Sequence, residues 1–217
     1  MVYFSDRKDA GKQLASALTD FSFKEGMVLA IPRGGVVVGY EIASALNFKL
    51  DVIIPRKIGT PDNPELAIGA VTEDGTMILD DSLIMYLGVS NDYIYQESER
   101  QKQEIRRRQN FYRQGVSEPE IKDKNVIVVD DGIATGYTMK AALASVRNRG
   151  AATLTVAIPV GPPSTIKELK HQADNIVCLY TPEYFQAIGQ FYSDFSQTTD
   201  KEVIELLKKQ KNLTTIE

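Results

Sequence analysis

The sequence predicts a doubly wound α/β fold with a mainly parallel sheet, and three observations support this prediction. Segments with a strand pattern alternate with segments of helical periodicity throughout the chain. Several of the strand segments are continuously apolar, as expected when helices cover both faces of a sheet. Two adjacent acidic residues, Asp130 and Asp131, end one of these strand segments, at the place where open parallel sheets bind their ligands.

The first part of the chain is expected to contain two strand–helix units and a hairpin. A helix is predicted over 5–21, because Ser5 or Asp6 suits the N-cap position and apolar residues then recur at helical spacing. Strands are predicted at 26–32 and 50–59, separated by a helix that opens with Gly34 and Gly35 and extends to residue 48. Residues 65–81 have the pattern of one or two short strands with a turn at 73–75.

The second part continues the alternation after a very polar segment at 91–114, which is predicted to be helical. Strands are predicted at 125–131, 152–160 and 175–182, and helices at 138–150, 163–172 and 200–210. Gly150 is expected to end its helix. Because no repeat, low-complexity tract or linker divides the sequence, we expect a single domain over 1–217.

Composition and charge favour a soluble cytoplasmic protein. The net charge of −4 gives no electrostatic reason to expect a nucleic-acid partner. No apolar run approaches the roughly 20 residues of a membrane span, and the charged N-terminus does not have the pattern of a signal peptide. Cys178 lies in an apolar strand segment and is interpreted as a core residue, and the lone His171 as a surface residue of a helix.

The segment from Asp130 to Thr138 combines acceptors and donors within nine residues. The two carboxylates can accept hydrogen bonds from the vicinal hydroxyls of a sugar. The small and hydroxyl residues that follow lead into a helix, where backbone N–H groups can surround a phosphate. Gly136 would let the backbone approach an anion closely, and Thr135 and Thr138 can donate hydroxyls. A sugar phosphate needs both kinds of group.

A simpler interpretation is an N-cap and a tight turn before a helix, but one aspartate would suffice for that. The segment also lacks the P-loop pattern G-x-x-x-x-G-K-[ST] and the dinucleotide pattern G-x-G-x-x-G. We therefore favour a ribose-phosphate site over a nucleotide site of either of those two types.

"VIVVDDGIATGYT" closely resembles the ribose-phosphate motif of the type I phosphoribosyltransferases. Two further stretches resemble motifs of this family in the expected order. "AIPRGG" is similar to the pyrophosphate loop after the first sheet strand, and "VIIPRKIG" is similar to the second strand with the Arg-Lys pair that precedes a flexible catalytic loop. The three motifs cover roughly residues 25 to 160.

The resemblance implies transfer of the 5-phosphoribosyl group of 5-phosphoribosyl 1-pyrophosphate (PRPP) to a nucleobase or related heterocycle, with release of Mg-pyrophosphate. Asp130 and Asp131 would hold the ribose hydroxyls, directly or through Mg²⁺ and water, and would act with Arg33 in catalysis. The family pattern further implies a role in nucleotide metabolism and a homodimer. The residues it assigns to PRPP are Arg33, Gly34, Gly35, Arg56, Lys57, Asp130, Asp131, Ala134, Thr135, Gly136, Tyr137 and Thr138.

Hood elements that cover the base are expected near 1–25 and 175–217. Tyr184 and Phe185 are the candidates for stacking on a heterocycle there, although core packing explains them equally well. Ala134 stands where family members acting on hypoxanthine and guanine carry an aspartate, which counts against such an acceptor. The acceptor therefore stays open.

Two segments between the motifs invite alternative interpretations. Residues 58–75 contain prolines and glycines around Glu65 and are expected to form a mobile lid, since the site must exclude water, although an ordinary connecting hairpin fits too. The helix near 90–114 is an insertion relative to the family. Arg106, Arg107 and Arg108 on it form a solvated face or, alternatively, lend an arginine to a phosphate in the site.

A different class of function uses the same binding site. The fold also serves non-catalytic modules that sense PRPP or a nucleotide, and fold alone does not distinguish them from enzymes. A receiver-like phosphoacceptor domain is a third interpretation of the "VVDD" stretch. We set it aside because the acidic pair of such a domain follows the first strand, whereas here it lies midway along the chain.

Overall fold

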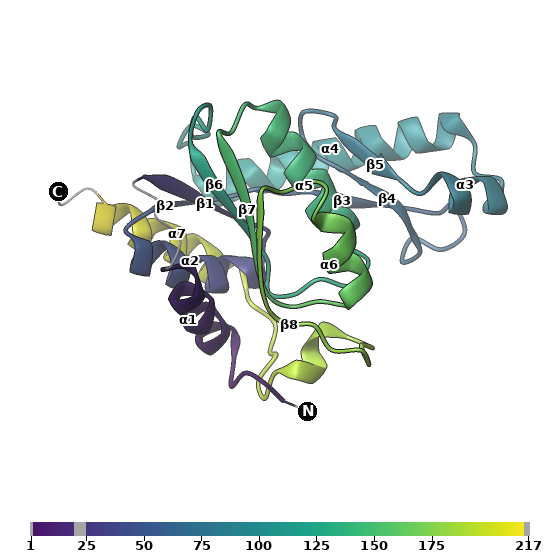
Figure 1. Cartoon of the computed structure of the whole chain (residues 1–217). Helices are drawn as coiled ribbons and strands as arrows, with labels where there is room; N and C mark the ends of the chain where they lie inside the picture. The colour runs from purple at the N-terminus through teal and green to yellow at the C-terminus, as the bar shows by residue number, and fades with distance from the viewer. Residues whose placement is uncertain (1, 20–24, 215–217) are drawn as a thin grey trace.

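The computed structural model describes residues 2–19 and 25–214, and its centre is a five-stranded parallel sheet (Figure 1). The strand order is β2-β1-β6-β7-β8. These strands are β1 (Gly26–Ala30), β2 (Lys49–Val52), β6 (Asn125–Val129), β7 (Thr153–Val160) and β8 (Asn175–Tyr180). Every neighbouring pair in this sheet is parallel. The predicted doubly wound α/β fold is therefore confirmed.

Helices cover both faces of this sheet because alternate residues of each strand point to opposite sides. One face packs on α1 (Arg7–Leu18), α2 (Gly34–Leu46) and α7 (Asp200–Thr214), and the other on α5 (Tyr137–Asn148) and α6 (Pro163–Leu169). In β1, Val28 and Ala30 belong to the first core, whereas Met27 and Leu29 belong to the second. This two-sided burial explains why the strand segments are continuously apolar.

A second, three-stranded antiparallel sheet follows β2 in the chain. It contains β3 (Arg56–Gly59), β4 (Ala67–Val71) and β5 (Met77–Leu79) in the order β3-β4-β5. The prediction of one strand over 50–59 is therefore wrong. The main-sheet pairing extends only to Ile53, whose N–H donates to the Ala30 carbonyl at 3.1 Å, and Pro55 lacks an N–H to continue it.

Two helices connect this small sheet to β6. The first, α3 (Asp81–Leu87), was not predicted, although Asp80 caps it by accepting from the Leu83 N–H at 2.9 Å and Gly88 ends it in the left-handed conformation. The second, α4 (Asn91–Arg113), is the predicted insertion helix. Figure 1 shows α4 passing alongside the small antiparallel sheet.

The residues after β8 pack against the N-terminal segment. They include the 3₁₀ helix η1 (Ile188–Phe191). The N–H groups of Tyr3 and Phe4 donate to the Phe191 carbonyl at 2.9 and 3.1 Å, and the Tyr3 ring stacks on Tyr180 with centroids 4.1 Å apart. Parts of the predicted hood, and the end of the predicted first helix at Phe21, lie outside the described residues.

Within the described ranges, no helix has both the length and the apolarity needed to cross a membrane.

Candidate active site

The carboxyl ends of β1, β2 and β6 face one cavity of about 760 Å³. Because these strands are parallel neighbours, the polar residues that follow each of them come to the same edge of the sheet. The motifs predicted from separate parts of the sequence therefore meet in space. The predicted PRPP residues that line the cavity are Arg33, Gly34, Arg56, Lys57, Asp130, Asp131 and Thr138.

The glycine turn after β1 lies directly against the two aspartates. A Cβ atom placed on Gly34 would lie 1.9 Å from Asp131 Oδ2, and one on Gly35 would lie 2.9 Å from Asp130 Cα. The peptide bond between Pro32 and Arg33 is cis. Glycine is required here because any side chain would displace the carboxylates.

The aspartates differ in their electrostatic surroundings. Asp131 Oδ2 accepts a hydrogen bond from Arg7 Nε at 2.6 Å, which forms an ion pair with little solvent exposure. Asp130 Oδ1 accepts from the Asp131 N–H at 2.8 Å. Burial, followed by the nearby Asp131 carboxylate, raises the pKa of Asp130 well above its ordinary value. The pair therefore attracts an additional cation or hydroxyl donor.

Arg7 is a site residue that the sequence analysis missed. Its Nη1 donates to the Ser196 carbonyl at 2.7 Å, and its guanidinium lies 3.8 Å from the centroid of the Phe195 ring. Arg7 thus connects the first helix, the Asp131 carboxylate and the segment after η1. One weak signal was present, since a basic residue in the first turn of a helix opposes the helix dipole and calls for another explanation.

The loop before α5 has the features expected of a phosphate-binding turn. Gly136 occupies the N-cap with φ of 78°, a conformation that favours glycine, and it has no side chain that could cap the helix N–H groups. Thr165 Oγ1 donates to the Ala134 carbonyl at 2.7 Å and fixes the loop. Thr138 faces the cavity, Ala134 and Thr135 are exposed, and the Tyr137 hydroxyl turns away to donate to Asp80.

The cations of the predicted pyrophosphate side are held by neighbouring elements. Arg33 Nη1 lies 3.7 Å from Asp200 Oδ1 at the start of α7. Arg56 Nε donates to the side-chain oxygen of Gln101, and burial, followed by the nearby Arg108, lowers the pKa of Arg56. Lys57 is exposed at the cavity.

Helix α4 forms one wall of the cavity, which sequence reasoning raised only as an alternative. The buried Glu97 accepts from Gln101 Nε2 at 2.6 Å and from two nitrogens of Arg100 at 2.7 Å each, so Glu97 orients the amide that holds Arg56. Of the three consecutive arginines, Arg108 lines the cavity. Arg106 and Arg107 are more exposed than Arg108, in agreement with a solvated face.

The structure does not bring Tyr184 and Phe185 to this cavity. Tyr184 is 88% exposed and lines a separate hollow with Tyr3 and Phe191, while the Phe185 ring packs on Phe191 with centroids 5.3 Å apart. The side chains from the region after η1 that do line the cavity are Phe195, Gln197 and Thr198. The contact of Phe195 with Arg7 joins residues far apart in the chain, so no local sequence pattern points to Phe195.

The donor set suits a magnesium ion that arrives with the substrate. Within the described parts of the chain, no cluster of three or more Asp, Glu, His or Cys side chains has the arrangement of a metal site. Asp130 and Asp131 offer hard carboxylate oxygens, and Mg²⁺ typically uses one or two carboxylates together with substrate phosphate oxygens. These two carboxylates therefore suit an Mg²⁺ ion that enters with PRPP better than an Mg²⁺ ion that the protein binds by itself.

Comparison with known proteins agrees with this geometry. Residues 6–196 match the model of the phosphoribosyl transferase domain. Two curated proteins from strains of Mycobacterium tuberculosis, one of them named "Putative phosphoribosyl transferase Rv0571c", are 42% identical over 211 residues, or 96% of this chain. The chain spans only 47% of the length of these relatives.

One solved structure shares the fold over almost the whole chain. The crystal structure of TT1426 from Thermus thermophilus is 40% identical, with a TM-score of 0.82 that covers 96% of this chain and 99% of that one. A purine phosphoribosyltransferase from Pyrococcus horikoshii is far more distant, at 18% identity and a TM-score of 0.48 over 84% of this chain and 88% of that one. It carries no argument about the acceptor. The fold and the site define a type I phosphoribosyltransferase-like protein, and the chain belongs to the phosphoribosyl transferase family.

Proposed function

We propose that this protein transfers the 5-phosphoribosyl group from Mg-PRPP to a nitrogen heterocycle and releases Mg-pyrophosphate. The observation that carries the proposal is the contact between the glycine turn at Gly34 and the carboxylates of Asp130 and Asp131, inside a cavity lined by several cations. A sugar with an anionic group at each end needs carboxylates for its hydroxyls and cations for its anionic groups. The bond from C1 to the pyrophosphate oxygen breaks, and a bond from C1 to an acceptor nitrogen forms.

Each part of the substrate has a matching part of the site. The N-terminal turn of α5 offers backbone N–H groups to the 5′-phosphate. Asp130 and Asp131 accept from the ribose hydroxyls and stabilise positive charge developing on the sugar. Arg33, Arg56 and Lys57 face the leaving pyrophosphate and stabilise the negative charge that it gains.

The acceptor side is formed by the segment after η1. Gln197 and Thr198 offer an amide and a hydroxyl to a heterocycle, next to the Phe195 ring. Ala134, which replaces a carboxylate of the 6-oxopurine members, provides no acid for that chemistry. We therefore propose an acceptor that does not depend on protonation from this position.

A pyrophosphate-release screen tests the proposal. The protein is incubated with Mg-PRPP and a panel of purines, pyrimidines and other nitrogen heterocycles, and released pyrophosphate is measured. We expect turnover with at least one acceptor, and turnover slower by about tenfold or more with Asp131→Asn at equal enzyme concentration. Tight PRPP binding without turnover across the panel would contradict catalysis and favour the PRPP-sensing alternative.

A further inference from the structure

The guanidinium of Arg108 lies at the candidate active-site cavity, and the phosphoribosyl transfer proposed above gives it no role. Arg108 belongs to α4, the helix that forms one wall of this cavity. Its Nε donates to Glu104 Oε1 at 2.7 Å. Among the described residues, nothing accepts a hydrogen bond from its two Nη groups. Both Nη groups can therefore donate to a ligand in the cavity.

The positive charge of Arg108 is only partly compensated, because Glu104 is shared with a second arginine. The two oxygens of Glu104 also accept from Arg107 Nε and Nη2, at 2.7 and 2.9 Å. One carboxylate thus pairs with two guanidinium groups, and the three side chains together keep one positive charge in excess. An excess of this sign at the wall of a cavity favours an anionic ligand.

The helical period of α4 places Arg108 on the same face as Gln101, the residue that holds Arg56. Seven residues separate the two positions, which is about two turns or roughly 10 Å along the helix. Both side chains line the cavity, whereas Arg107 does not. Arg107 is 65% exposed and Arg108 33% exposed. Of these two neighbouring arginines, Arg108 is therefore the one that can reach a ligand.

Arg108 lies near both arginines of the proposed pyrophosphate side. Burial, followed by the charge of the nearby Arg108, lowers the pKa of Arg56. One helical turn beyond Arg108, the Tyr112 hydroxyl donates to Asp200 Oδ1 at 2.5 Å. The same carboxylate oxygen lies 3.7 Å from Arg33 Nη1. The fold thus brings three guanidinium groups to one side of the cavity, where they repel each other unless an anion lies among them.

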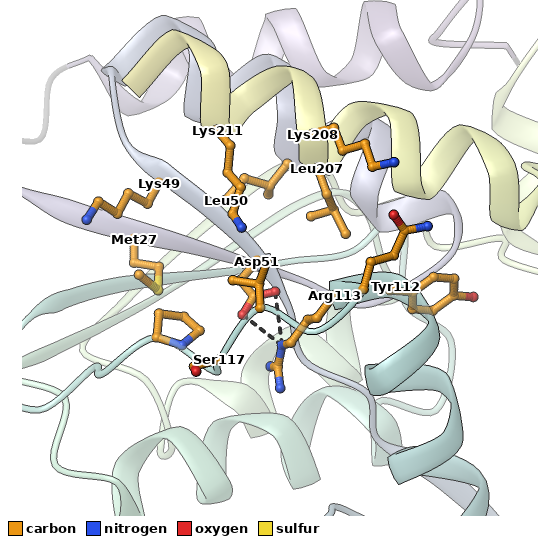
Figure 2. A pocket seen from close by; sticks show the side chains of 13 residues that line it. Met27, Lys49, Leu50, Asp51, Tyr112, Arg113, Ser117, Leu207, Lys208 and Lys211 are labelled. Atoms are coloured by element: carbon orange, nitrogen blue, oxygen red, sulfur yellow. Dashed lines mark hydrogen bonds and ion pairs between the residues drawn. The ribbon is translucent and has the colours of Figure 1, made fainter. Parts of the chain in front are cut away.

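Contacts toward both ends of α4 fix the direction of this helix. Near its C-terminal end, Arg113 Nε donates to the two oxygens of Asp51 at 3.3 and 3.1 Å, and Figure 2 shows this ion pair joining α4 to β2 in the wall of a second cavity. Both side chains of the pair have little solvent exposure. Near the other end, the Tyr93 hydroxyl donates to the Gly59 carbonyl at 3.1 Å. A group on a fixed helix is already oriented before its ligand arrives.

We propose that Arg108 binds the pyrophosphate group of PRPP and stabilises it as it leaves, and this step rests on the proposed function. A planar guanidinium with two unused Nη groups can contact two phosphate oxygens at once. When the bond from C1 to the pyrophosphate oxygen breaks, the electron pair stays on that oxygen. Arg108 then opposes the additional negative charge together with Arg33 and Arg56.

Titration calorimetry with inorganic pyrophosphate in the presence of Mg²⁺ tests this role without an acceptor. We expect Arg108→Gln to weaken pyrophosphate binding about tenfold, because two hydrogen bonds to a charged group are lost. Ribose 5-phosphate has no pyrophosphate, so its affinity should stay within about twofold of the wild type. Arg108→Lys keeps the charge but loses the planar fork, and should recover part of the pyrophosphate affinity.

Arg107→Gln is the matched control, because it removes the same charge and a partner of the same Glu104 outside the cavity. It should bind pyrophosphate as the wild type does. Equal losses in the Arg107→Gln and Arg108→Gln variants would overturn the proposal, since they would show an unspecific effect of charge. A loss of ribose 5-phosphate binding equal to that of pyrophosphate would also overturn it, since it would show damage to the whole site.

The pyrophosphate titration also separates this proposal from the proposed function. Unchanged pyrophosphate affinity in Arg108→Gln, or no pyrophosphate binding by the wild type, would overturn the role of Arg108. Neither result would contradict turnover found in the pyrophosphate-release screen. Conversely, a wild type that binds pyrophosphate through Arg108 but does not bind Mg-PRPP would overturn the proposed transfer and support Arg108 as an anion-binding residue.

Discussion

The carboxylate of Asp131 contacts both Arg7 and the glycine turn, and its charge is expected to matter most as the sugar becomes positive. Asp131→Asn keeps the shape but removes this charge. Interactions made mainly in the transition state affect kcat, whereas uniform binding affects KM. We expect kcat to fall about tenfold to a thousandfold, or about 1.4–4 kcal/mol, with a smaller loss of PRPP affinity. Steady-state kinetics with an acceptor from the screen measure both.

Thr135→Val is the contrasting change, because Thr135 lies in the loop that we propose for the 5′-phosphate, remote from the reacting carbon. We expect it to raise KM for PRPP and to leave kcat nearly unchanged. If Asp131→Asn leaves both kcat and binding unchanged, the role assigned to the aspartate pair is wrong.

The raised pKa of Asp130 predicts a pH-dependent cost to stability. Burial and the neighbouring carboxylate raise the folded-state pKa above the ordinary 3.8, so the folded state binds more protons than the unfolded state between these two values. Stability of the wild type therefore falls as the pH rises through this window. We expect Asp130→Asn to increase the urea midpoint at about pH 7, with a gain that shrinks as the pH approaches 3.8. A variant that is less stable at neutral pH would contradict this account.

At the residue scale, the sequence was sufficient to predict those site residues whose positions follow from a local sequence pattern. Asp130, Asp131 and Gly34 lie at strand ends, and a parallel sheet brings strand ends together. Arg7 escaped the sequence analysis because its partner Asp131 lies 124 residues away, so only tertiary packing brings the two into contact. Tyr184 and Phe185 were placed by analogy with a hood, and nothing local distinguished them from Phe195.

At the element scale, α4 supplies the side chain that orients Arg56. Gln101→Leu removes the acceptor for Arg56 Nε and the donor to Glu97, while the residue stays similar in size. We expect kcat/KM for PRPP to fall about tenfold or more, since Arg56 would lose its fixed direction toward the pyrophosphate. Gln103→Leu makes the same chemical change at an exposed position of the same helix and serves as the control. Equal kcat/KM values for the two variants would show that α4 does not contribute to the site.

The β3–β4 connection is the second element to test. Gly59, Thr60 and Pro64 line the cavity, and the Tyr93 hydroxyl donates to the Gly59 carbonyl at 3.1 Å. Within the predicted lid 58–75, residues 67–71 form the buried, paired strand β4, so we expect the amide hydrogens of the connection at 60–66 to exchange quickly in the free protein and slowly with Mg-PRPP bound, because a closed lid excludes water. Hydrogen exchange measured by mass spectrometry decides this, and slow exchange in the free protein would remove the lid role.

Sequence patterns predicted where these elements lie better than they predicted where each element ends. The helix predicted for the very polar segment 91–114 is confirmed, whereas the strand predicted over 50–59 runs through Pro55 and joins residues of two different sheets. Apolar strands of the two sheets look alike in sequence, and only the proline marks the boundary. The short helix α3 has a capping aspartate and a terminal glycine, but too few apolar residues to show a period.

At the scale of the whole molecule, Mg-PRPP is expected to stabilise the fold, because the cavity draws residues from α1, the turn before α2, β3, α4, α5 and the segment after η1. A ligand that binds only the folded state adds RT ln(1 + [L]/Kd), about 2.7 kcal/mol at a hundredfold excess over Kd. For a chain of this size, that corresponds to an increase in Tm of roughly 5–10 °C. Ribose 5-phosphate should stabilise less, because it lacks the pyrophosphate for which we propose Arg33 and Arg56. A thermal-shift titration measures both ligands, and no response to millimolar Mg-PRPP would rule out the binding site on which the proposed function depends.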